Sequence, residues 1–164
     1  MTAAPTPFDD LLLLVGRLSY TWTNTETLLI HLIAGLARTD KETAVIIYLT
    51  LNTTRARIDL VERLAKLDRT AADEKRATLA LTGQIMKHSA LRNRFSHSIY
   101  AFDPDTGTAR TIMMRIADRK DAIKVGRSDV IDAGTIARIE SAIADLGALN
   151  GKLWRHIARF DYPS

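Results

Sequence analysis

The chain has 164 residues and a mass of 18.2 kDa, the length of one ordinary domain that can bury a sizeable core. Its composition is 46% hydrophobic and 26% charged with no cysteine, which excludes a disordered tail, a disulfide scaffold and a thiolate metal site. The net charge of +4 is mildly basic, and arginine, which suits bidentate phosphate contacts, outnumbers lysine. The basic residues are dispersed among acids, so the charge favours a local phosphate-contacting site over a dedicated duplex-DNA-binding protein.

The N-terminal region lacks the features of a membrane or secretory segment. Its longest uninterrupted apolar run, Leu11 to Val15, is far shorter than the roughly 20 residues that span a bilayer. The run follows Asp9 and Asp10 rather than a basic segment, which argues against a secretory signal. We therefore expect a cytoplasmic protein without a membrane partner.

Four long segments carry apolar residues at spacings of three, four and seven, the pattern of amphipathic helices. Thr6 and Pro7 form a helix start, because a hydroxyl at the N-cap and a proline at the first helical position are both favoured there. The predicted helices cover residues 7–37, 41–66, 71–96 and a last segment from Ile136 to Phe160. Residues 1–6 are expected to form an N-terminal arm, and residues 7–164 a single helical domain.

A short β-prone region interrupts the helical pattern before the last helix. Residues 98–102 and 111–116 flank the sequence Asp103-Pro104-Asp105-Thr106-Gly107, in which proline and glycine suit a tight turn followed by a left-handed residue. Lys120 to Arg127 is a candidate third strand. The expected fold is therefore mainly all-α, a bundle of four long helices with a small β-hairpin inserted before the last helix.

Charged residues interrupt three of the apolar stripes. Glu26 lies between Trp22 and Leu29, Arg55 between Leu51 and Ile58, and His88 and Arg92 follow Ile85 at core spacing. A buried charge is costly unless it is paired, so one interpretation is a polar layer in which Glu26 pairs with Arg55 or Arg92 and to which His88 belongs. The alternative is that the stripes drift and that these side chains reach solvent at the rim.

One short segment near the predicted end of the third helix carries an arginine, an amide and a histidine. Such a trio suits cleavage of RNA without a metal. His97 could take a proton from a ribose 2′-hydroxyl or give one to the leaving 5′-oxygen, and Arg92 could hold the phosphate oxygens as charge builds. Asn93 precedes His97 by four residues, so the amide could orient the imidazole. Arg94 and Ser96 are further candidates for phosphate contacts.

This segment resembles the motif of the HEPN superfamily, compact helical bundles that carry Arg, a polar residue and, after four to six intervening residues, His. The matching residues here are Arg92-Asn93-Arg94-Phe95-Ser96-His97, six residues of the chain, and the helical architecture covers most of it. The resemblance implies an endoribonuclease that needs no metal or other cofactor and acts on RNA, often as a homodimer with two motifs across one cleft. Relatives act as toxins, toxin–antitoxin partners, defence effectors or RNA-processing enzymes, and others are inactive interaction modules.

The sequence also contains features that differ from this resemblance. Residues five apart on a helix point about 140° from each other, so Arg92 and His97 converge only if the helix ends there or a second protomer contributes. The inserted hairpin is not required by the family, and an exposed strand invites pairing with a second copy.

Two other functions compete with the ribonuclease. The first is a non-enzymatic interaction or dimerisation module with a protein partner, in which His97 is a helix-end imidazole favoured by the macrodipole and Arg92 pairs with Glu26. The second is a sensor with a small-molecule pocket around Glu26, Arg55 and His88. The histidines lie on separate predicted elements, and no spacing typical of a zinc or di-iron site occurs.

Overall fold

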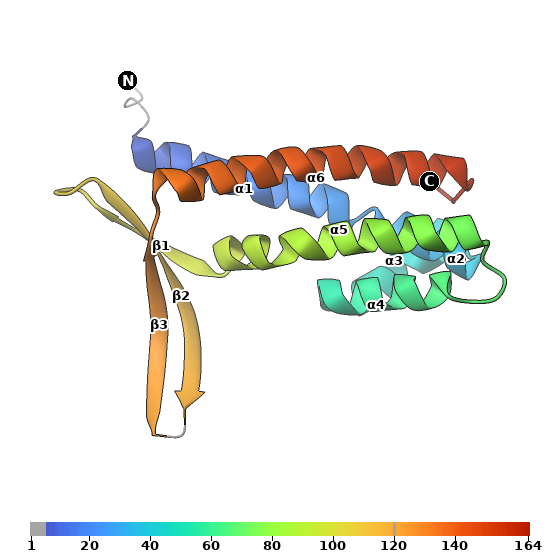
Figure 1. The fold of residues 1–164 in the computed structure, drawn as a ribbon, viewed down its shortest axis with the longest axis horizontal. Helices are drawn as coiled ribbons and strands as arrows, with labels where there is room; N and C mark the ends of the chain where they lie inside the picture. Colours follow the sequence, from blue (N-terminus) through green and yellow to red (C-terminus); the bar gives the residue numbers. More distant parts are fainter. Residues whose placement is uncertain (1–5, 120) are drawn as a thin grey trace. The chain divides into compact units, whose positions relative to one another are not determined.

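The computed structural model describes residues 6–119 and 121–164 (Figure 1). The predicted class is confirmed: in these residues the chain is mainly helical, and a small antiparallel sheet precedes the last helix. The elements are α1 (Pro7–Glu26), α2 (Leu29–Ala37), α3 (Lys41–Thr50), α4 (Thr54–Ala65), α5 (Ala72–Ser96), β1 (Ser98–Asp103), β2 (Thr108–Arg119), β3 (Ala122–Val130) and α6 (Ala133–Arg159). Most of the expected N-terminal arm, residues 1–5, lies outside the described residues.

The chain divides into two compact units, which are described separately. Unit 1 comprises Met1–Tyr20 and Ala90–Ile143, and unit 2 comprises Thr21–Ser89 and Ala144–Ser164. The single helical domain expected over residues 7–164 stays a prediction. Within the described part of the chain, none of the helices has both the length and the apolar character needed to cross a bilayer.

The helix predicted over residues 7–37 is interrupted after Glu26, so it forms α1 and α2. At its start, Thr6 caps α1: its hydroxyl accepts from the Asp9 N–H (3.3 Å), and its own N–H donates to the Asp9 carboxylate (2.7 Å). At the interruption, the Thr27 hydroxyl donates to the Asn24 carbonyl (3.2 Å). Threonine and asparagine side chains compete with the helical hydrogen-bond ladder, and three threonines occur between residues 23 and 27. The apolar spacing continues across this break, which is why periodicity alone predicts one helix.

The helix predicted over residues 41–66 is also divided, into α3 and α4. Asp40 caps α3 by accepting from the Thr43 N–H (2.8 Å), as its position before the apolar stripe favours. Leu51 then adopts an extended conformation, and Thr53 caps α4 by accepting from the Ala56 N–H (3.1 Å). A new helix start at Thr53 resets the helical phase, so residues 51 and 55 do not continue one stripe.

The core of unit 2 is built around α2, which is apolar on almost every side and packs against α3 and α4. Burying an aliphatic side chain contributes about 1.5–3 kcal/mol, so this short helix is held by packing rather than by its length. The fully buried aliphatic side chains of unit 2 include Leu29, Leu32, Ile33, Ile58, Ile85, Leu146, Leu149 and Leu153.

Unit 1 contains the sheet, whose strands are ordered β1-β2-β3 and are antiparallel throughout. The β1–β2 turn has the predicted geometry: the Asp103 carboxylate accepts from the Asp105 N–H (3.0 Å), and Gly107 is left-handed with φ of +65°. A third strand is confirmed, although it runs to Val130 with Gly126 inside it rather than ending at a glycine turn. Lys120, the predicted first residue of this strand, lies outside the described residues.

Gly35 and Gly83 provide a matched test of packing in unit 2. A Cβ built on Gly35 would lie 2.1 Å from Cδ1 of the Tyr162 ring, whereas one on Gly83 would meet nothing within 4 Å. We predict that Gly35→Ala lowers the free energy of unfolding by about 1–3 kcal/mol through overpacking. Gly83→Ala, in an exposed helix interior, should raise it by about 0.5–1 kcal/mol. Urea denaturation of both variants measures the difference, and equal effects would contradict this packing.

Candidate functional site

The Arg-Asn-x3-His segment lies at the C-terminal end of α5, within unit 1. The helix ends at Ser96, and His97 occupies the single residue between α5 and β1. The His97 N–H donates to the Asn93 carbonyl (3.2 Å), so His97 still follows the last helical turn. Asn93, Ser96 and His97 are exposed, and Arg92 is half-buried. The predicted placement at a helix end is therefore present.

Two side chains of β1 hold this helix end. The Ser98 hydroxyl donates to the Arg94 carbonyl (2.6 Å), and the Tyr100 hydroxyl donates to the Phe95 carbonyl (2.6 Å). These bonds satisfy carbonyls that have no partner inside the helix. Burial raises the pKa of Tyr100 to about 12, so its hydroxyl stays protonated and remains a donor at neutral pH. The backbone next to His97 is thus anchored from the strand that follows it.

Arg92 and Asn93 are joined by a side-chain hydrogen bond. The Arg92 Nη1 donates to the Asn93 Oδ1 at 2.8 Å. The Asn93 amide oxygen thus accepts from Arg92, and the role of this amide in orienting the His97 imidazole stays a prediction. The pair presents a guanidinium on the same helix end as an exposed imidazole, which is the chemistry that a phosphodiester site requires.

Arg94 is directed differently from its neighbours. Its guanidinium is half-buried, with Nη2 3.4 Å from the Asp129 carboxylate on β3, and its Nε is buried without a hydrogen-bond partner in the described residues. Asp129 also accepts from the Nε of Arg127 (3.1 Å), which is 74% exposed. Asp129 therefore links Arg94, one of the predicted phosphate-contacting residues, to an exposed arginine that the motif does not include.

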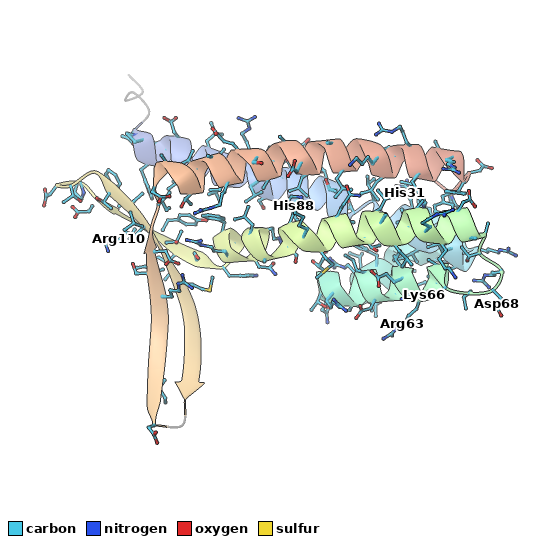
Figure 2. The ribbon with its side chains drawn as sticks, viewed as in Figure 1. His31, Arg63, Lys66, Asp68, His88 and Arg110 are labelled. Atoms are coloured by element: carbon cyan, nitrogen blue, oxygen red, sulfur yellow. The ribbon has the colours of Figure 1, made fainter. Side chains whose placement is uncertain are left out.

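The four histidines differ in their exposure to solvent. All four of the chain lie in its described part: His31 and His156 are buried, His88 is half-buried, and His97 is exposed (Figure 2 labels His31 and His88). His31 contacts the Pro163 carbonyl through Nδ1 (2.7 Å), and His156 contacts the Thr78 hydroxyl through Nε2 (3.2 Å). Of the four, His97 is the one with the exposure that a proton-transfer group acting on a polymer needs.

Glu26 lies in unit 2 and is buried, with 4% of its surface exposed. Its carboxylate accepts from Trp22 Nε1 (2.8 Å), from the Thr54 hydroxyl (2.7 Å) and from Arg57 Nη1 (3.0 Å). Arg57 also donates through Nε to the Tyr48 carbonyl (3.2 Å), and its guanidinium lies 4.0 Å from the centre of the Tyr48 ring. The predicted buried charge is thus present and satisfied, but its cation is Arg57.

Of the two interpretations of Arg55, pairing with Glu26 is wrong, and the alternative in which the side chain reaches solvent is confirmed. Arg55 is exposed, with 69% of its side-chain surface accessible, and pairs with Asp59 one turn along α4 (2.9 Å). The phase of α4 is set at Thr53, so Arg57 lies next to the buried Ile58 while Arg55 faces solvent. Arg57 precedes the buried Val61 by four residues, so core spacing within α4 also selects it. The Asn-Thr-Thr sequence at 52–54 is the signal that separates the phase of α4 from that of Leu51.

His88, the third member of the expected polar layer, lies 3.9 Å from the Asp145 carboxylate. Burial lowers the pKa of His88, and the charge of Asp145 partly offsets that effect, so the ring is mostly neutral at pH 7. Glu26, Arg55 and His88 therefore each have a different carboxylate or cation partner.

A hollow of about 350 Å³ in unit 2 lies elsewhere, at the ends of α2 and α6. Its charged lining residues are Arg38, Arg69, Glu74 and Asp161. The Tyr162 hydroxyl donates to the Glu74 carboxylate, and Arg69 donates to the Leu36 carbonyl (2.9 Å). The sensor hypothesis requires a small-molecule pocket lined by Glu26, Arg55 and His88. None of these three residues lines this hollow.

Comparison with known proteins adds no family to this description. No protein-family model matches the chain, and neither a curated protein nor a solved structure matches it. The class of this protein is therefore stated from its own geometry: a mainly helical chain with an exposed histidine and a hydrogen-bonded Arg-Asn pair at one helix end.

Arg57 and Arg55 provide a matched test of the polar cluster. We predict that Arg57→Ala lowers the free energy of unfolding by about 3 kcal/mol, because it leaves a buried carboxylate without its cation. Arg55→Ala should cost less than about 1 kcal/mol, as expected for an exposed pair. In a double-mutant cycle with Glu26→Gln, Arg57→Ala should be strongly non-additive. Additive effects in denaturant unfolding would reject the pairing.

Proposed function

We propose that this protein is a metal-independent endoribonuclease whose site is the Arg92, Asn93 and His97 cluster at the end of α5. The observation that carries the proposal is an exposed His97 at the same helix end as the hydrogen-bonded Arg92–Asn93 pair. An imidazole titrates near neutral pH and can both take and give a proton, and a guanidinium binds phosphate oxygens in a planar, two-pronged geometry.

The proposed reaction is transesterification within RNA. A base removes the proton of the ribose 2′-hydroxyl, the 2′-oxygen forms a bond to phosphorus, and the bond from phosphorus to the 5′-oxygen breaks. An acid protonates the leaving 5′-oxygen, so the products carry a 2′,3′-cyclic phosphate and a 5′-hydroxyl. Arg92 stabilises the negative charge that builds on the non-bridging oxygens, while His97 transfers protons.

Two proton transfers take place in this reaction, one from the nucleophile and one to the leaving group. Each chain exposes one histidine, because the other three are buried or half-buried in unit 2. We therefore propose that the active form is a homodimer, in which His97 of one protomer acts as base and that of its partner acts as acid. A dimer would also bring two Arg92 guanidinium groups to one phosphate.

His97→Ala should reduce the rate of RNA cleavage by at least about 100-fold, since general acid–base groups contribute about 10²–10⁴-fold. The free energy of unfolding of this variant should fall by no more than about 1 kcal/mol, because an exposed helix-end imidazole contributes little to stability. Cleavage of labelled RNA in EDTA by the wild type, His97→Ala and Arg92→Ala measures this.

Gly83→Ala, an exposed change on the same helix, serves as the control and should cleave like the wild type. Retention of full activity by His97→Ala would remove His97 from the mechanism. Loss of activity in Gly83→Ala as well would show that the assay responds to changes in α5 in general.

The second candidate function is a non-enzymatic dimerisation module, and apolar surface on α1 favours it. Leu13 is 64% exposed and borders a hollow of about 370 Å³ in unit 1, lined by residues of α1 and by Ile136 and Glu140 of α6.

We predict that Leu13→Asp shifts the chain from dimer to monomer in sedimentation velocity, because burying the introduced carboxylate would be costly. His97→Ala should sediment as the wild type does, and an unchanged Leu13→Asp would exclude this surface.

A further inference from the structure

The sheet of unit 1 contains a two-stranded extension. β1 pairs with β2 from Ser98↔Met113 to Asp103↔Thr108, whereas β2 pairs with β3 as far as Arg119↔Ala122. Residues 114–119 of β2 and 122–127 of β3, here called the ribbon, therefore continue beyond the pairing with β1 (Figure 1). At about 3.3 Å per residue, six residues reach about 20 Å, the scale of a nucleic-acid groove.

Positive charge is concentrated on this part of the sequence. Residues 115–127 contain five basic and two acidic residues, so they hold three of the four net positive charges of the chain. The five are Arg115, Arg119, Lys120, Lys124 and Arg127. An isolated two-stranded ribbon is only marginally stable in water, so binding of a polyanion to one with a net positive charge would stabilise it.

The ribbon begins beside the proposed catalytic residue. Ser98, which follows His97 directly, pairs with Met113, and Met113 pairs with Arg127. Neighbouring strands lie about 4.8 Å apart, so the backbone of Arg127 is about 10 Å from that of Ser98. The exposed Arg127 is bonded to Asp129, which also holds Arg94 near the end of α5. A strand of RNA at His97 would therefore continue toward the segment of the sequence that carries these basic residues.

We propose that the ribbon binds the phosphate backbone of a double-stranded RNA stem and presents the adjoining nucleotides to His97; this rests on the proposed function and names its substrate class. Residues 114–127 contain no Phe, Tyr or Trp. Binding of single strands relies on stacking of bases on aromatic side chains. Duplex RNA is instead recognised by its shape and through its phosphates and 2′-hydroxyls, for which basic side chains suffice.

The test measures binding separately from chemistry. A hairpin RNA that carries 2′-O-methyl groups on its unpaired nucleotides alone cannot be cleaved at those positions and keeps the 2′-hydroxyls of its stem. Fluorescence anisotropy reports its affinity for the whole chain. The ribbon variant is Arg115→Gln, Arg119→Gln and Lys124→Gln. The control variant is Arg63→Gln, Lys75→Gln and Arg76→Gln, which removes the same charge from exposed positions on α4 and α5 in unit 2 (Figure 2 labels Arg63).

The ribbon variant should bind the hairpin at least about tenfold more weakly than the control at the same salt concentration. The slope of log affinity against log salt should also fall in magnitude by about 3 if all three cations contact phosphates, because roughly one counterion is released per phosphate contact. Circular dichroism and thermal melting confirm that both variants fold.

Equal affinity of the two variants would overturn the proposal. Equal or tighter binding of a single strand of the same composition would overturn the assignment to a stem. These results are independent of catalysis. If the wild type binds the hairpin through the ribbon but does not cleave natural RNA, the proposed ribonuclease function is wrong and the proposed RNA binding by the ribbon is supported.

Discussion

The end of α5 depends on hydrogen bonds that come from the following strand. Ser98 and Tyr100 donate to the Arg94 and Phe95 carbonyls, which the helix itself leaves unsatisfied. The helix ends one residue before β1, so these bonds link the last turn of α5 to the strand that follows His97. A reactive group on a fixed backbone needs less reorganisation than one on a mobile loop.

The buried Glu26 of unit 2 and the exposed His97 of unit 1 have contrasting surroundings. In unit 2, Glu26 is buried, and its carboxylate is satisfied by an indole, a hydroxyl and the Arg57 guanidinium, which is what the energetic cost of burial demands. In unit 1, His97 and Arg127 remain exposed. A satisfied buried pair specifies structure, whereas exposed groups such as the His97 imidazole can also contact a ligand. This contrast is why the proposed activity is assigned to the α5 end.

Much of this fold could be predicted from local sequence chemistry. The Thr6 cap, the Asp40 cap and the left-handed Gly107 each follow from a side chain next to the backbone that it bonds or frees. The breaks after Glu26 and Leu51 could not be predicted from periodicity, because apolar spacing continues across both. That error carried through to the site: once Thr53 restarts the helix, Arg57 rather than Arg55 faces inward. The position of the motif at a helix end could be predicted from the sequence. The hydrogen bonds from Ser98 and Tyr100 that hold this end could not, because the residue pattern does not say how β1 packs against α5.

The most direct measurement of the central claim is the chemistry of the cleaved ends. A short RNA cleaved by the protein in EDTA is analysed by mass spectrometry, beside the same RNA with one 2′-deoxy nucleotide at the mapped cleavage position. The account predicts 2′,3′-cyclic phosphate and 5′-hydroxyl ends on the first, and no cleavage at that position on the second, because the attacking oxygen is missing. Cleavage of the deoxy substrate, or products with 3′-hydroxyl ends, would contradict attack by the 2′-hydroxyl and the role assigned to His97.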